Sequence, residues 1–174
     1  MVGNDYSDSV DSMDYPARHV VSAAAGWLEL ANHREALAEL ETLPAEARAH
    51  PESLDIEWKA HAGLRQWEPA LVVAERLIER SPDEVAGWIH RSYCLHELRR
   101  TREAMELLSP AYTRFQRDFV VPYNMACYAC QLGDLAGAKT WLERACRQGN
   151  ARTIKRMAMQ DSDLAAIHPE IGEL

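Results

Sequence analysis

The residue pattern of this chain repeats every 34 positions, and this repeat limits the possible folds more than any other feature of the sequence. Two columns keep the same residue in four successive copies without an insertion or a deletion: leucine at Leu30, Leu64, Leu98 and Leu132, and alanine at Ala36, Ala70, Ala104 and Ala138. Two matching columns at a fixed separation are difficult to obtain by chance. A period of this length is typical of solenoids, in which similar supersecondary units stack.

The clearest copy of the unit spans residues 123–145, YNMACYACQLGDLAGAKTWLERA. Its apolar residues follow the spacing of one amphipathic helix up to Leu132 and of a second helix from Leu135, with Gly133-Asp134 as the turn. We call the first helix of each unit the A helix and the second the B helix. The sequence therefore predicts an all-α solenoid of antiparallel helix pairs.

Four units fit the chain, at about residues 16–50, 51–83, 84–117 and 118–150. Residues 1–15 are acidic and show no period, so they are predicted to form a disordered tail. Residues 151–174 contain apolar residues at helical spacing, Ile154, Met157 and Leu164. A solenoid must cover its last open face, so this segment is predicted to be a C-terminal cap, with a short final helix that ends before Pro169.

Several residues predict where individual helices begin or end. Asn32 has the spacing of a capping box with Glu35, and Ser81 has the same relation to Glu84, with Pro82 at a first helical position. Pro110 lacks the amide hydrogen that an α-helix requires, so a kink or break is predicted near Ser109.

Composition excludes several classes of protein. The chain has a formal net charge of -8, which disfavours a nucleic-acid surface because such surfaces need clustered Lys and Arg. No window is long and apolar enough for a membrane span, and the N-terminus lacks the pattern of a secretory signal. We therefore expect a cytoplasmic protein whose four cysteines stay reduced.

The residues resemble tetratricopeptide repeats, a family of 34-residue helix-turn-helix units, over residues 17–150. The family's turn glycine corresponds to Gly133, its small packing residues to Ala138 and Ala145, its A-helix tryptophan to Trp88, and its terminal proline to Pro82. His33 and Thr101 depart from the family, which has a large apolar residue there. The resemblance implies a right-handed superhelix whose A helices form a concave wall that holds peptide segments of partner proteins.

The family's groove positions in the third and fourth units carry aromatic, apolar and polar residues, which the resemblance marks as a candidate peptide-binding groove: Ile89, Tyr93, His96, Arg100, Tyr123, Asn124, Cys127 and Gln131. Exposed patches of this kind usually mark binding sites. The first A helix has Val21 and Ala25 where chaperone-binding members have Lys and Asn, so an acidic chaperone tail is disfavoured. Either a partner segment or a terminal segment of this chain could lie over the groove residues.

No catalytic motif is evident, so the chain is not expected to be an enzyme, and no cofactor is implied. Cys127 and Cys130 form a Cys-x-x-Cys pair, but they lie inside a predicted A helix, where buried cysteines usually fill small apolar positions. A metal site that combines them with His96 would lack a fourth ligand, and none is predicted.

We therefore expect a non-enzymatic module that binds an unidentified protein or peptide in its groove, and neither nucleic acid nor a membrane. Three alternatives remain at the level of the sequence: a scaffold protein that pairs two copies into a homodimer, a small chaperone, and a metal or redox protein that uses Cys127 and Cys130.

Overall fold

The computed structural model describes residues 13–173, and helices form all of their regular secondary structure. The four predicted pairs are present, with α1 (Tyr15–Glu29) and α2 (His33–Glu41), α4 (Pro51–Gly63) and α5 (Trp67–Arg80), α6 (Val85–Glu97) and α7 (Thr101–Arg114), and α8 (Val120–Gln131) and α9 (Leu135–Gln148). The helical turn α3 (Ala45–Arg48) joins the first two pairs, and α10 (Ala151–Ala158) and the 3-10 helix η1 (Ser162–Glu173) follow the fourth.

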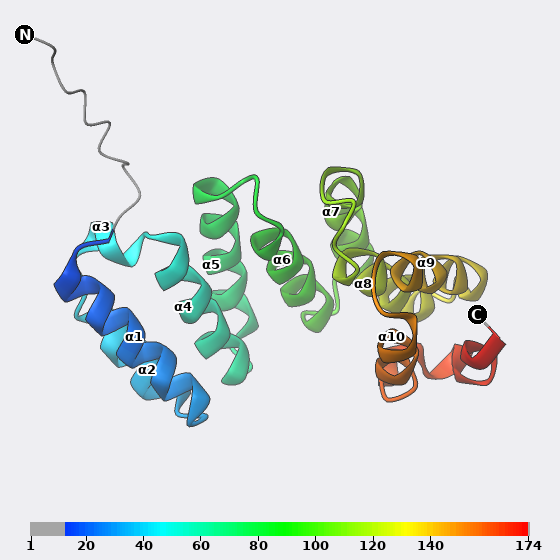
Figure 1. Cartoon of the computed structure of the whole chain (residues 1–174), viewed down its shortest axis with the longest axis horizontal. Helices are drawn as coiled ribbons and strands as arrows, with labels where there is room; N and C mark the ends of the chain where they lie inside the picture. Colours follow the sequence, from blue (N-terminus) through cyan, green and yellow to red (C-terminus); the bar gives the residue numbers. More distant parts are fainter. Residues whose placement is uncertain (1–12, 174) are drawn as a thin grey trace, which may run out of the picture.

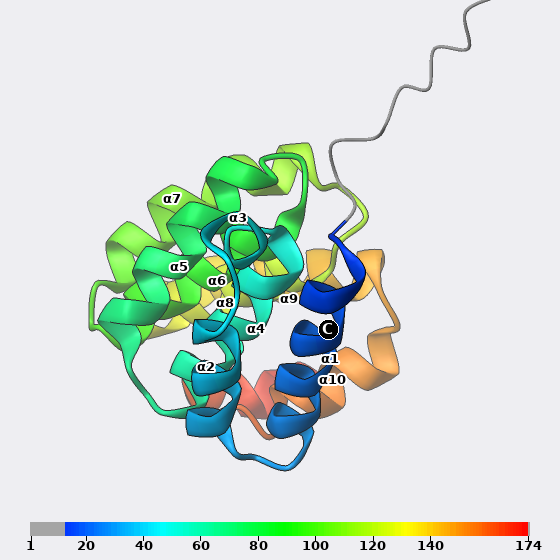
Figure 2. The same ribbon diagram turned by 90° about the vertical axis from the view of Figure 1, so that its left-hand side faces the viewer.

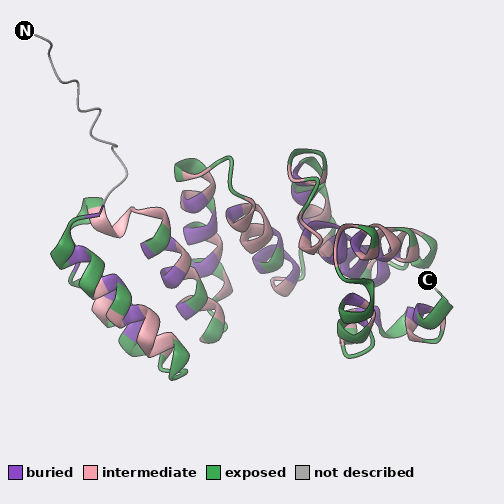
Figure 3. Ribbon diagram, viewed as in Figure 1, coloured by how far each residue is buried: buried purple, intermediate pink, exposed green. Residues whose placement is uncertain are grey.

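The helices succeed one another along the long axis of the molecule in chain order, as a solenoid requires (Figure 1). Seen from the N-terminal end, the B helices α2, α5 and α7 lie on the outer side, and the A helices α4, α6 and α8 lie toward the middle (Figure 2). Buried and exposed residues alternate along α1 and α5, as expected for helices that bury one face (Figure 3). In the described part of the chain, no helix is long and apolar enough to cross a membrane.

The alanine column is fully buried within the pairs. Ala36, Ala70, Ala104 and Ala138 are all 0% exposed. The leucine column has a different role, because its members occupy the C-cap positions of the A helices. Leu30 is 72% exposed, and Leu135, which lies outside this column at the start of α9, is 38% exposed. Inside the pairs the alanines pack together with large buried side chains such as Leu40, Leu108 and Leu142.

The turn after each A helix has a left-handed residue, and these residues recur with the sequence period. Positive φ angles occur at Ala31 (56°), Arg65 (57°), Arg99 (64°) and Gly133 (85°). The amide of each left-handed residue donates to the carbonyl three residues earlier, and the amide of the next residue donates to the carbonyl five residues earlier. In the second unit, Arg65 donates to Ala62 and Gln66 donates to His61. This is the Schellman arrangement, which normally places glycine at the left-handed position. Only the fourth unit has that glycine.

Three predicted helix boundaries are corrected by the structure. Asn32 precedes α2, but its side chain makes no capping hydrogen bond. The helix α6 begins at Val85, because residues 81–84 form a turn in which the Glu84 amide donates to the Ser81 carbonyl. The helix α7 continues through Pro110 without a break. The carbonyl that Pro110 leaves without a partner belongs to the exposed Glu106, where water can satisfy it.

Both ends of the solenoid also differ from the prediction. Of the tail predicted at residues 1–15, residues 1–12 lie outside the described part, but Met13 is buried and Asp14 caps α1 by accepting from Ala17. At the other end, Met157 is 40% exposed instead of facing inward, because Ile154 and Ala158 supply the buried face of α10. The helix η1 continues past Pro169 to bury Ile171.

Candidate functional site: the A-helix wall

We call the inner faces of α6 and α8 the A-helix wall, since most of the predicted groove residues lie there. Tyr93 is 38% exposed, whereas His96, Tyr123 and Cys127 are 7%, 7% and 5% exposed. Of the remaining predicted residues, Ile89 and Asn124 are half-buried, while Arg100 and Gln131 are exposed and lie at the ends of the helices. The wall thus has an exposed part around Tyr93 and a covered part along α8.

The cover is a segment of the same chain, residues 161–163 at the start of η1. The Tyr123 hydroxyl donates to Asp161 Oδ2 at 2.9 Å, and the Cys127 thiol points to the same oxygen at 3.6 Å. The other carboxylate oxygen, Oδ1, accepts from the Asp163 amide and so caps η1. The His168 side chain is 3.0 Å from the Asp161 main-chain oxygen. Asp161 therefore joins α8 to the last element of the fold.

Asp163 makes the second set of contacts. His96 Nε2 lies 3.0 Å from Asp163 Oδ2, and His96 Nδ1 lies 3.0 Å from the Thr101 hydroxyl. A neutral imidazole satisfies both contacts when Nε2–H donates to the carboxylate and Nδ1 accepts from Thr101. The side-chain amide of Gln131 donates to the main-chain carbonyl of Asp163 at 2.9 Å. A carboxylate and a peptide carbonyl are thus both held by side chains of the wall.

Burial keeps the donors of the wall protonated. Burial, together with the hydrogen bond to Asp161, raises the pKa of the Tyr123 hydroxyl well above its ordinary value. Burial and the charges of Asp161 and Asp163 raise the pKa of the Cys127 thiol in the same direction. Both groups therefore remain hydrogen-bond donors across the physiological range. Hydrogen bonds to an ionised acceptor are among the stronger ones in proteins, at about 1.5–3 kcal/mol net.

The exposed part of the wall centres on Tyr93, which belongs to an aromatic cluster with Trp58 on α4, Trp67 on α5 and His90 on α6. Trp58 stacks on His90 with ring centroids 3.5 Å apart, and Tyr93 meets the edges of Trp58 and Trp67 at 6.4 and 5.6 Å. Burial, with Glu97 nearby, raises the pKa of Tyr93 to about 12. The Tyr93 ring is fixed by its neighbours, and its exposed face is available for contact.

A hydrogen bond to His90 helps to fix the position of this cluster. His90 Nε2 lies 2.9 Å from Asp55 Oδ1, and the second Asp55 oxygen pairs with Lys59. Burial would raise the pKa of Asp55, but the hydrogen bonds and charges of His90 and Lys59 outweigh it, so the pKa lies below its usual 3.8. The ionised Asp55 orients the His90 ring against Trp58.

The Cys-x-x-Cys pair lies inside the fold. Cys127 and Cys130 are buried in the largest hydrophobic cluster, and burial raises the pKa of both thiols. A reactive or metal-binding cysteine needs a lowered pKa. Among residues 13–173, no group of three or more His, Cys, Asp or Glu side chains is placed to hold a metal ion.

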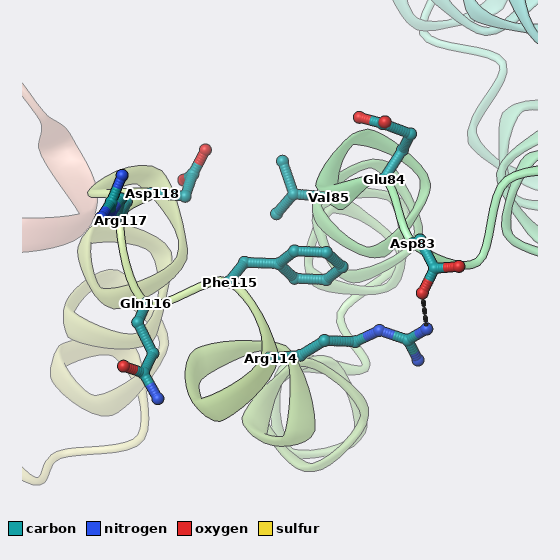
Figure 4. Close-up of a pocket in the computed structure, with 8 residues that line it drawn as sticks. All are labelled: Asp83, Glu84, Val85, Arg114, Phe115, Gln116, Arg117 and Asp118. Atoms are coloured by element: carbon teal, nitrogen blue, oxygen red, sulfur yellow. Dashed lines mark hydrogen bonds and ion pairs between the residues drawn. The ribbon is translucent and has the colours of Figure 1, made fainter.

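Two surface depressions are formed where the third and fourth units meet. One is formed by the ends of α6 and α7 and the start of α8, where Phe115 lies beside Val85 and Arg114 pairs with Asp83 (Figure 4). The other lies at the turns after α6 and α8 and is lined by charged and polar residues, among them Arg99, Arg100, Arg102, Glu103, Glu106 and Gln131. Arg100 is paired with Glu103 at 2.7 and 2.8 Å. The second depression therefore carries side chains of both charges and adjoins the covered part of the wall at Gln131.

The stacked pairs, the periodic turns and the inner wall define a class: this chain has the fold of a tetratricopeptide repeat solenoid. No family model matches the sequence, and no curated protein matches it. Similar solved structures include TTC0263, a thermophilic TPR protein of Thermus thermophilus, with a TM-score of 0.70 and 19% identity over 90% of this chain and 83% of that one. MamA of Desulfovibrio magneticus RS-1, from residue 41 to its end, has a TM-score of 0.70 and 18% identity over 94% and 97%. A MamA structure from MSR-1 has a TM-score of 0.65 and 15% identity over 83% and 82%.

The sequence identifies the wall but misses part of its chemistry. Trp58 and Trp67 occupy packing positions in the repeat, yet they support the exposed Tyr93 ring. Asp161 and Asp163 are not among the predicted groove residues, although both contact the wall. Two carboxylates, separated by one residue and close to an otherwise apolar cap, are the signal that this segment meets polar partners.

Proposed function

We propose that this protein is a non-enzymatic interaction module that binds a segment of another protein along its A-helix wall, starting at Tyr93. The observation that supports the proposal is that Tyr93 is exposed while its ring packs against Trp58 and Trp67. Rigid aromatic side chains offer large contact area with little loss of conformational freedom, and they are enriched among the residues that dominate binding energy.

The remaining predicted groove residues have different roles in this proposal. Ile89 and Asn124 are half-buried on α6 and α8, and Arg100 and Gln131 are exposed and line the same depression. His96, Tyr123 and Cys127 are reached only when residues 161–163 leave the wall, because those residues now contact them. A partner first meets Tyr93 and then extends toward α8.

The test is affinity capture with the full-length chain, in which the bound proteins are identified by mass spectrometry and the same capture is made with the Tyr93→Ala variant. Tyr15→Ala is the matched control, since Tyr15 is an exposed tyrosine at the start of α1, away from the wall. For the partner identified, Tyr93→Ala should weaken binding by at least about 1 kcal/mol, or roughly fivefold, while Tyr15→Ala and Glu106→Ala leave it unchanged. If Tyr15→Ala or Glu106→Ala weakens binding and Tyr93→Ala does not, the partner uses another face.

A homodimer is a second proposal, and it rests on the N-terminal end of the solenoid. Leu30, the C-cap of the first helix, and Tyr15, its first residue, are 72% and 83% exposed. Two copies that pair through this end would cover these residues. Light scattering on a size-exclusion column should then give twice the chain mass, and Leu30→Glu should return the monomer mass.

A further inference from the structure

The chain's own residues 161–163 are held on the A-helix wall as a bound peptide would be. The wall donates to both carboxylates through Tyr123 and His96, and to a main-chain carbonyl through Gln131. These three donors come from α6 and α8, which belong to different units. Recognition of side chains and backbone together is typical of peptide binding and unusual for a cap that packs by apolar contacts alone.

The two carboxylates are spaced so that each reaches a hydrogen-bond donor on a different helix of the wall. Asp161 reaches the α8 donor and Asp163 reaches the α6 donor, with Ser162 exposed between them. An exposed connection precedes the segment, since Met159 and Gln160 are both exposed. The next residue after the segment, Leu164, is 0% exposed in the core, so the two aspartates leave the wall when the start of η1 unpacks with them, while α10 keeps its own buried residues Ile154 and Ala158.

The surroundings favour an acidic occupant. The donors at the wall are a tyrosine hydroxyl, an imidazole, a thiol and an amide, and all of them can donate to a carboxylate. The depression that includes Gln131 is lined by Arg99, Arg100 and Arg102 and by Glu103 and Glu106. Its three arginines outnumber its two glutamates, and in a chain with a net charge of -8 this small local excess of positive charge favours an acidic segment beside the wall.

We propose that the wall of α6 and α8 is a recognition site for a partner segment that carries two aspartates separated by one residue, and that residues 161–163 occupy this site until such a segment displaces them. This inference rests on the proposed function, and it adds the chemistry of the partner and the regulation of access. The apparent affinity for a partner is then lower than the affinity of the open wall by the fraction of molecules in which the wall is open.

The test uses a fluorescent peptide with the sequence of residues 159–172, MQDSDLAAIHPEIG, and a control peptide in which both aspartates are asparagine. Both are titrated by anisotropy against the full-length protein and against its Asp161→Asn/Asp163→Asn variant. The variant weakens the internal occupant and leaves the wall intact, so it should bind the aspartate peptide at least tenfold more tightly than the unaltered chain. The asparagine peptide should bind the variant at least tenfold more weakly than the aspartate peptide.

Thiol accessibility gives a second measurement on the same proteins. Cys127 and Cys130 lie under residues 161–163 and η1, so a thiol reagent should modify them faster in the variant, and the aspartate peptide should restore their protection. Cys146, which is half-buried on α9, reports any general unfolding. If the double variant does not fold, Asp163→Asn, which keeps Asp161 and its cap, is used with the same peptides and the same two thresholds.

Equal binding of the two peptides, or no binding to the opened wall, overturns the inference. The proposed function is tested separately by Tyr93→Ala, because Tyr93 makes no hydrogen bond to residues 161–163 in the described contacts. If the peptides fail while Tyr93→Ala still weakens partner binding, the interaction module stands and its partner lacks the two aspartates. If Tyr93→Ala has no effect while the peptides behave as expected, the wall of α6 and α8 is the site and the aromatic cluster is not.

Discussion

The left-handed residues at the four A–B turns lead to a prediction in which the same substitution has opposite effects at two positions. Gly133 has a φ of 85°, and a methyl group added there would meet no atom within 4 Å. Gly26 lies inside α1, and a methyl group there would also meet nothing within 4 Å. Because the added methyl group meets no atom at either site, replacing glycine with alanine changes only the conformational free energies of the folded and unfolded chains.

The magnitude follows from those free energies. A left-handed conformation costs a residue with a Cβ atom about 1–2 kcal/mol, while replacing glycine removes unfolded-state freedom worth about 0.4–1 kcal/mol. Gly133→Ala should therefore destabilise the protein by about 0.5–1 kcal/mol. Gly26→Ala should stabilise it by about 0.5–1 kcal/mol, since alanine is the better residue inside a helix. Arg65→Gly, at an exposed left-handed position, should also be stabilising, by about 0.5–1 kcal/mol.

Urea unfolding followed by circular dichroism measures these effects as shifts of the midpoint. Midpoints are the appropriate quantity, because units of a solenoid do not always unfold together. The reasoning is refuted if Gly133→Ala raises the midpoint as much as Gly26→Ala does, or if Arg65→Gly lowers it. Either result would mean that the turns relax out of the left-handed conformation at little cost.

Two further predictions concern packing and charge. Ala138→Leu forces three extra carbon atoms into a site that is 0% exposed, so it should destabilise the protein by about 1–3 kcal/mol and lower the melting temperature by several degrees. The control Ala136→Leu, at an exposed position of the same helix, should not lower it. An unchanged melting temperature for Ala138→Leu would contradict the close packing of the alanine column. Asp55→Asn should lower the urea midpoint at pH 7, and the difference from the unaltered chain should shrink as the pH falls below about 4. The sign follows because the folded-state pKa of Asp55 is depressed, so its stabilising contribution is present above the unfolded-state value and is lost as the pH falls through the folded-state value. A difference that stays constant down to about pH 3 would argue against an ionised Asp55 beside His90.

The helix pairs could be predicted from the sequence because their determinants are local and repeated. The spacing of Ala36 and its three equivalents, together with Gly133, specifies a tight helix pair in each unit. The left-handed conformation of Arg65 and Arg99 could not be predicted residue by residue, since arginine shows no preference for it. The periodic position, two residues before each B helix begins, is the available signal, and it can be recognised directly only where glycine occurs.

The sequence predicts which candidate residues lie along α6 and α8, but it leaves open whether a partner segment or a terminal segment of the chain lies over them. Which of the polar residues at 161–163 meets His96 or Tyr123 depends on how α10 turns the chain, and no local pattern determines that direction. The start of α6 escaped prediction for a similar reason. Asp83 pairs with Arg114, and the Pro82 carbonyl accepts from Trp88, so tertiary contacts hold this turn out of the helix.

The contact between His96 and Asp163 joins positions 67 residues apart in a fold whose other contacts are mainly between neighbours in the chain. It lies within one continuous cluster that extends from Leu95 to Ile171, whereas the first two units have smaller clusters of their own. Amide hydrogens of α8, α9 and η1 should therefore exchange with solvent through one cooperative opening, slowly and together. Those of α1 and α2 should exchange faster and independently, so that this chain loses its order from the N-terminal end first.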